Sequence, residues 1–111
     1  MGEFIVEDVE WKKGELGLQK FILFESDGIT RRNGTGITYN FAFWKRKAAA
    51  NKGSGALVPV DAPNGEYTYA VQAGDTDTID EYIGELIEDP TGSKLKSDTF
   101  KVNVAESSDK T

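Results

Sequence analysis

Hydrophobic and polar residues alternate with the two-residue period of a β-strand in three segments of this chain, at 37–44, 66–71 and 99–104. In each segment the apolar side chains share one face, as in strands that pack on a core with one side and face water with the other. The segment 21–24, Phe-Ile-Leu-Phe, is apolar at every position, as expected of a strand that is covered on both faces. The pattern therefore predicts strands, not helices.

Turn residues separate these strands. Residues 62–65 (Ala-Pro-Asn-Gly) and 89–92 (Asp-Pro-Thr-Gly) place proline second and glycine fourth, which suits a type I β-turn. Residues 57–60 should pair with 66–71 as a hairpin, and Pro59 puts that strand at a sheet edge because proline cannot donate to a ladder. About seven short strands between regular turns predict an all-β fold, an antiparallel β-sandwich, with a small barrel as the alternative.

A chain of 111 residues supports one domain with one core. We divide it into an N-terminal extension or first strand at 1–17, a sandwich at 18–105 and a polar tail or linker at 106–111. The N-terminus is acidic, so no signal peptide is visible, and no apolar run is long enough to cross a bilayer. With no cysteine and no histidine, the chain has no disulfide and no thiol or imidazole chemistry.

Charge is segregated along the chain. The formal net charge of −6 argues against binding of duplex DNA. Residues 28–60 nevertheless contain six basic residues and no acid, against 7 basic and 19 acidic residues elsewhere. Such a stretch is either a solvated loop or a patch for an oppositely charged surface, which includes another copy of the chain. Trp44 faces away from Phe43 beside this stretch. The candidate partner contacts are Trp44, Arg31, Arg32, Lys45, Arg46 and Lys47.

Four acidic residues, Asp75, Asp77, Asp80 and Glu81, crowd one loop ahead of an apolar strand. Asp75 and Asp77 resemble the start of a calcium loop, but the oxygen ligand, glycine and glutamate that an EF-hand needs further along are missing. A looser, weak calcium site at Asp75, Asp77 and Asp80 stays open. No motif sets a second carboxylate opposite this loop, so we expect no catalytic pair, metal or cofactor, and no enzyme activity.

A structural interpretation accounts for more of this loop. In immunoglobulin domains a tyrosine at the corner before the penultimate strand sends its hydroxyl back to the backbone upstream. Tyr82 is placed for that role, while Asp75 and Asp77 are expected to accept hydrogen bonds from loop amides. Tyr82, Gly84 and Leu86 should point inward, and Gly84 stands where antibody-type domains have a cysteine. The sequence thus predicts an immunoglobulin-like sandwich with a structural corner at Tyr82, Asp75 and Asp77.

Residues 56–89, followed by 97–104, resemble the immunoglobulin-like domain at the N-terminus of phage baseplate upper proteins and related small domains encoded among phage tail genes. The matching positions are Gly65, Tyr69, Asp75, Asp77, Tyr82, Thr99 and Phe100. Asp80 departs from the family, which usually has glycine there. The resemblance implies a non-enzymatic part of a phage or prophage tail or baseplate. Such a part would reside in the virion, contact other tail proteins or copies of itself, and help present receptor-binding parts.

Two other functions stay open at this level. A carbohydrate-binding sandwich would stack sugar rings on exposed aromatics, for which Trp11, Trp44, Tyr39 and Tyr67 are candidates. Single-stranded nucleic acid could stack on Trp44 beside the basic residues, although the acidic remainder opposes it. The N-terminal segment, with Val6, Val9 and Trp11 unplaced, could also pair with a neighbouring copy.

Overall fold

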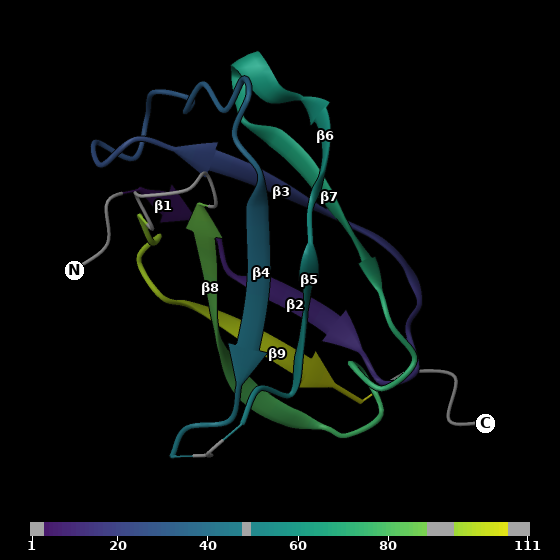
Figure 1. Cartoon of the computed structure of the whole chain (residues 1–111). Coiled ribbons are helices and arrows are strands. Elements are labelled where there is room, and N and C mark those ends of the chain that lie inside the picture. The colour runs from purple at the N-terminus through teal and green to yellow at the C-terminus, as the bar shows by residue number, and fades with distance from the viewer. Residues whose placement is uncertain (1–3, 48–49, 89–94, 107–111) are drawn as a thin grey trace.

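The alternating segments form strands of two packed sheets (Figure 1). The structure, a computed structural model, describes residues 4–47, 50–88 and 95–106. The strands are β1 (Ile5–Val6), β2 (Val9–Lys12), β3 (Gly17–Phe24), β4 (Tyr39–Trp44), β5 (Gly53–Ala56), β6 (Val58–Asp61), β7 (Glu66–Val71), β8 (Asp80–Glu88) and β9 (Phe100–Ala105), with a 3₁₀ turn η1 (Ala62–Asn64) between β6 and β7. The predicted all-β sandwich is confirmed.

One sheet has the order β1-β3-β7-β6 and the other the order β2-β9-β8-β4-β5. The first part of the chain contributes to both sheets, since β1 pairs with β3 and β2 then pairs with β9. The β2–β9 pairing is parallel, whereas the other strand pairs in the described residues are antiparallel.

The predicted hairpin and its turn are present. β6 lies at the edge of its sheet and pairs with β7, as the proline in this strand led us to expect. Gly65 N donates to Ala62 O at 3.0 Å, which closes the turn, and Gly65 takes the left-handed conformation with φ 68°. The other predicted turn, at 89–92, lies outside the described residues, as do residues 107–111 of the predicted tail.

β3 corrects one expectation, because it is not fully covered on both faces. Phe21 and Leu23 are buried, whereas Ile22 and Phe24 on the outer face are only partly buried. The guanidinium of Arg31 lies over the Phe24 ring, 5.6 Å from its centroid. The outer face of this strand is therefore shielded in part by a loop side chain instead of a packed layer.

Aromatic rings fill the space between the sheets. Phe41 on β4 is the hub, with Phe21 and Tyr69 from the opposite sheet at 5.0 and 4.9 Å between ring centroids. Trp11 from β2 is fully buried against Phe41 and Phe43, at 6.3 and 5.5 Å. Edge-to-face and offset contacts of this kind stabilise beyond the area that they bury. The core thus depends on rings contributed by β2, β3, β4, β7 and β9 together.

The N-terminal strands β1 and β2 therefore pack into the same sandwich as the rest of the described chain. Val6, Val9 and Trp11, which we considered as contacts for a neighbouring copy, are all buried in the core. The segment 1–17 supplies β1 and β2 to the two sheets of the sandwich. No helix in the described part of the chain is long and apolar enough to cross a bilayer.

Gly84 tests how tightly this core is packed. A Cβ at Gly84 would lie 2.7 Å from the Phe100 ring and 2.8 Å from Val102, so Gly84→Ala should lower the free energy of unfolding by about 1–3 kcal/mol. Gly74→Ala is the matched control, because nothing lies within 4 Å of a Cβ there and the change should be nearly neutral. Urea unfolding of both variants measures the difference, and equal midpoints would contradict close packing at Gly84.

Candidate functional site

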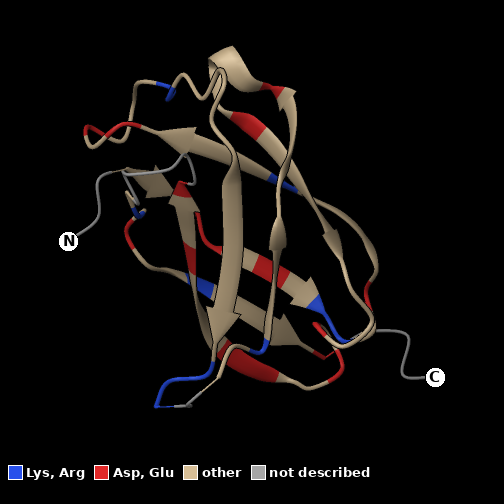
Figure 2. Ribbon diagram, viewed as in Figure 1, with Lys and Arg blue, Asp and Glu red and all other residues tan. Residues whose placement is uncertain are grey.

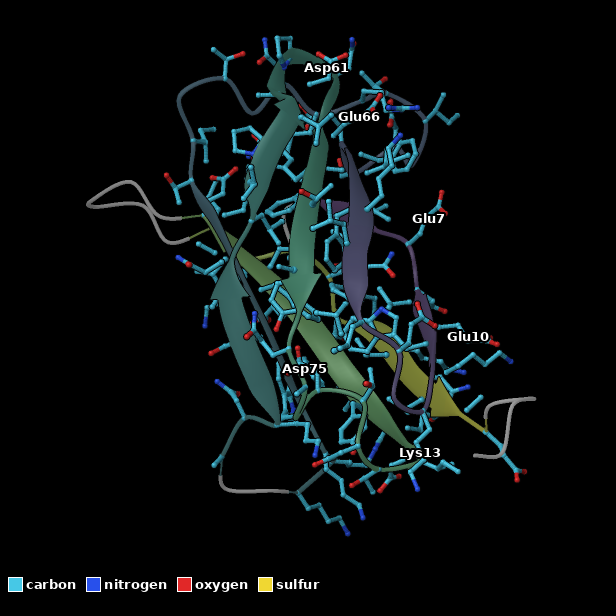
Figure 3. The ribbon with its side chains drawn as sticks, turned by 90° about the vertical axis from the view of Figure 1, so that its right-hand side faces the viewer. Glu7, Glu10, Lys13, Asp61, Glu66 and Asp75 are labelled. Atoms are coloured by element: carbon cyan, nitrogen blue, oxygen red, sulfur yellow. The ribbon has the colours of Figure 1, made fainter. Side chains whose placement is uncertain are left out.

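Asp75 closes the turn that follows β7 and is only 3% exposed (Figure 3). Its Oδ2 accepts hydrogen bonds from the Tyr69 hydroxyl at 2.6 Å and from Gln72 N at 2.8 Å. The Asp75 amide in turn donates to Gln72 O at 3.0 Å. The carboxyl group of Asp75 thus anchors the crossover from one sheet to the other. Burial, together with the bond to Asp75, raises the pKa of the Tyr69 hydroxyl.

Strand β5 lies directly against this pair, which explains its glycines. A Cβ at Gly53 would come within 2.2 Å of Asp75 Oδ1, and one at Gly55 within 3.0 Å of the Tyr69 ring. The inner face of β5 must therefore be bare backbone. The Trp11 ring stacks on the Tyr69 ring, and their centroids lie 6.4 Å apart.

Tyr82 does not make the hydrogen bond that we predicted for it. Its ring is 4% exposed and packs edge-on against Phe43 at 5.5 Å, but its hydroxyl bonds to no atom of the described residues. Burial raises the pKa of this hydroxyl, and the charges of Lys52 and Asp80 also act on it. The crossover is held by the bonds of Asp75 to the Tyr69 hydroxyl and to Gln72 N.

The other acidic residues of the loop are engaged separately. Asp77 pairs with Lys52, and Asp80 Oδ2 lies 2.8 Å from Lys45 Nζ. These hydrogen bonds lower the pKa of both carboxyl groups. Since the carboxyls of Asp75, Asp77 and Asp80 each bond to a different partner, they do not converge on one point. Among residues 4–47, 50–88 and 95–106, no group of three or more acidic side chains is arranged to hold a metal ion.

The basic segment is divided between the two ends of the sandwich (Figure 2). Arg31 bonds to Asn64 O at 3.1 Å and to Glu66 at 3.5 Å, near η1. Lys45 and Arg46 follow β4, at the opposite end of that strand. The two basic groups therefore lie at opposite ends of β4 and do not form one continuous patch.

Arg32 is largely withdrawn from the surface, with 15% of its side chain exposed. Its guanidinium bonds to the buried Glu88, with Nε 2.9 Å from Oε1, and to Glu25 at 2.8 Å. The Tyr39 hydroxyl donates to the same Glu88 oxygen at 3.0 Å, and the Phe4 ring lies 4.7 Å beneath the guanidinium. Burial by itself would lower the pKa of Arg32. The hydrogen bonds to Glu88 and Tyr39 outweigh this effect, so the pKa of Arg32 is raised. Arg32 is thus engaged in ion pairs within its own domain.

This network was missed by the sequence reasoning, although a signal existed. Tyr82, Gly84 and Leu86 were placed on the inner face of their strand, and the same alternation puts Glu88 on that face. A buried acid at the end of a strand requires a cationic partner. The basic residues nearest in the fold, in the loop after β3, were the ones to search.

The aromatic candidates for sugar stacking are mostly core residues. Trp11 and Tyr39 are fully buried and Tyr67 is 1% exposed, with the Tyr67 hydroxyl bonded to Gly34 O at 2.9 Å. Trp44 is partly buried on the outer face of the five-stranded sheet, opposite Ile83 of β8. Arg46 lines a surface hollow nearby with Asp8, Ile83, Thr99, Phe100 and Lys101. Trp44 is partly buried, and the other predicted contacts that remain at the surface are Arg31, Lys45, Arg46 and Lys47.

No protein-family model matches the sequence, and no curated protein sequence matches it. The structure is similar to that of the N-terminal domain of ORF48 of phage TP901-1, with a TM-score of 0.67 and 13% sequence identity. The similarity covers 93% of this chain and 96% of that one. The two chains share a fold.

The two buried tyrosines of the corner give a matched pair of variants. Tyr69→Phe removes the bond to Asp75 and should lower the free energy of unfolding by about 1.5–3 kcal/mol, because it leaves a buried carboxyl group with one partner fewer. Tyr82→Phe removes a hydroxyl that bonds to nothing described and should change stability by less than about 0.5 kcal/mol. Thermal or urea unfolding measures the stability of both variants. A larger loss of stability for Tyr82→Phe than for Tyr69→Phe would restore Tyr82 as the corner residue.

Tyrosine ionisation provides a second test. Burial raises the pKa of all four tyrosines, Tyr39, Tyr67, Tyr69 and Tyr82. Since their folded pKa values exceed the unfolded value near 10, stability is fully present below about pH 10 and is lost as the pH rises above it. Tyrosinate absorbance should therefore rise in one step, together with loss of the β-sheet circular dichroism signal. A separate step near pH 10 with an intact fold would contradict the burial.

Proposed function

We propose that this chain is a non-enzymatic structural module of a phage or prophage tail or baseplate, which assembles with other tail proteins and helps present receptor-binding parts. The observation that carries the proposal is the fold shared with a domain of a phage protein over nearly the full length of both chains. The sequence resemblance to phage baseplate domains at Tyr69, Asp75 and Phe100 supports the same assignment.

The chemistry of the described residues supports a passive role. Asp75 and Glu88, the two buried acids, are both bonded to side chains that hold strands together. Asp77 and Asp80 are paired with lysines at the surface. Carboxyl groups that are bonded in this way stabilise the fold. They are not placed to exchange a proton with a substrate as a general acid or base would.

The outer face of the five-stranded sheet is the contact surface that we favour. Trp44 and Ile83 are cross-strand neighbours there, and Arg46 and Lys101 border the hollow beside them. Tryptophan and arginine are enriched among the residues that contribute most of the binding energy at protein interfaces. This surface would take a partner that offers an apolar side chain and a carboxylate.

The proposal is tested in particles of a phage or induced prophage that carries the gene. Antibodies against the chain should label the tail of purified particles. Trp44→Ala should lower the amount of chain in those particles about fivefold, the effect of losing roughly 1 kcal/mol at an interface. Leu18→Ala is the control, since Leu18 is 72% exposed on the opposite sheet. Expression of the chain in the cell without any in purified particles would refute the assignment.

A further inference from the structure

The four sheet edges of this sandwich are not equally protected. Unpaired backbone groups at an edge invite another strand, and natural edges are guarded by charge, proline, irregularity or short length. β1 has two residues, β2 carries the exposed charges of Glu10 and Lys12, and β6 has Pro59 and a register shift. β5, Gly-Ser-Gly-Ala, ends its sheet without a charged residue, a proline or a register shift.

The unpaired groups of β5 can be assigned. Leu57 N donates to Tyr39 O at 2.9 Å, so Leu57 faces β4, and by alternation Gly55 and Gly53 face β4 as well. The N–H and C=O groups of Ser54 and Ala56 therefore point away from the sheet. Their side chains are small and lie on the outer face of the sheet, where they would not obstruct an added strand.

We propose that β5 pairs antiparallel with β5 of a second copy of this chain, about a two-fold axis at Gly55. In this register Ser54 of each copy lies opposite Ala56 of the other, and each such pair exchanges both of its backbone hydrogen bonds. Residues of the same face are matched, so the two five-stranded sheets join into one and both cores stay on the same side. Strand addition of this kind derives affinity from the main chain.

Charge complementarity selects a second copy as the occupant. β5 continues through Leu57 into β6, so one extended ribbon runs from the basic loop after β4 to Asp61 at the other end of the molecule (Figures 1 and 3). Within the described residues, neither Arg46 nor Lys47 has an ion-pair partner, and the side-chain carboxyl group of Asp61 bonds only to the Asn64 side chain.

An antiparallel pair of ribbons brings these unpaired charges together. Asp61 lies six residues beyond Gly55, roughly 20 Å along the strand, and the basic loop lies at a comparable distance in the other direction. Each basic loop then faces the Asp61 end of the other copy. A chain of net charge −6 would otherwise repel its copy. The pairing concerns the domain by itself and holds or fails independently of a role in a phage tail.

Sedimentation of the whole chain from micromolar to millimolar concentration tests this pairing. We expect a reversible dimer that dissociates further as salt is raised. Ser54→Pro replaces an N–H that points away from the sheet, so the domain should keep its circular dichroism spectrum and become monomeric. Ser54→Ala keeps that N–H and should dimerise like the wild type. A wild-type chain that stays monomeric overturns the proposal and leaves β5 to a strand from another protein.

A charge exchange tests the second half of the argument and does not alter the edge strand. Asp61→Lys and Arg46→Glu should each weaken dimerisation about fivefold or more, and the double variant should restore it. If Ser54→Pro fails to fold, this pair decides. Dimers that are insensitive to both single exchanges, or a folded Ser54→Pro that dimerises as the wild type does, would show that the copies meet elsewhere.

Discussion

The buried hydrogen bond between the Tyr69 hydroxyl and Asp75, 2.6 Å long, is the constraint around which the lower half of the sandwich is arranged. It holds the crossover between the sheets, supports the Trp11 ring and leaves so little space above it that β5 must be glycine on its inner face. A buried acid of this kind is tolerated only because donors meet it. The edge strand that remains exposed to a partner is thus a consequence of how this acid is buried.

A second buried acid does comparable work at the other end. Glu88 joins the end of β8 to Tyr39 at the start of β4 and, through Arg32, to the loop after β3. Between these two polar anchors lies the aromatic core around Phe41. Buried ion pairs contribute less to stability than apolar packing of the same volume, but they specify which loop lies where. Both acids therefore serve the architecture of the domain, in keeping with a scaffold.

The sequence predicted those strands and turns whose structure is determined by their own residues. β4, β7 and β9 alternate, and the turn before β7 carries its own proline and glycine. The strands that were missed or left unplaced lack such a signal. β5 is half glycine because of Tyr69 and Asp75, and the passage from β1 to β2 between sheets depends on partners far along the chain. The alternation along their strands placed both Tyr69 and Tyr82 on the buried face. Tertiary geometry decides which of the two hydroxyls bonds to the crossover.

The parallel pairing of β2 with β9 has a mechanical meaning. Val9 to Lys12 run alongside Val102 to Ala105 in the same direction. Once the two residues of β1 have peeled from β3, tension that draws the two chain ends apart slides these strands past each other, so their ladder bonds share the load instead of opening one by one. Unfolding under such tension then requires several of these bonds to break together.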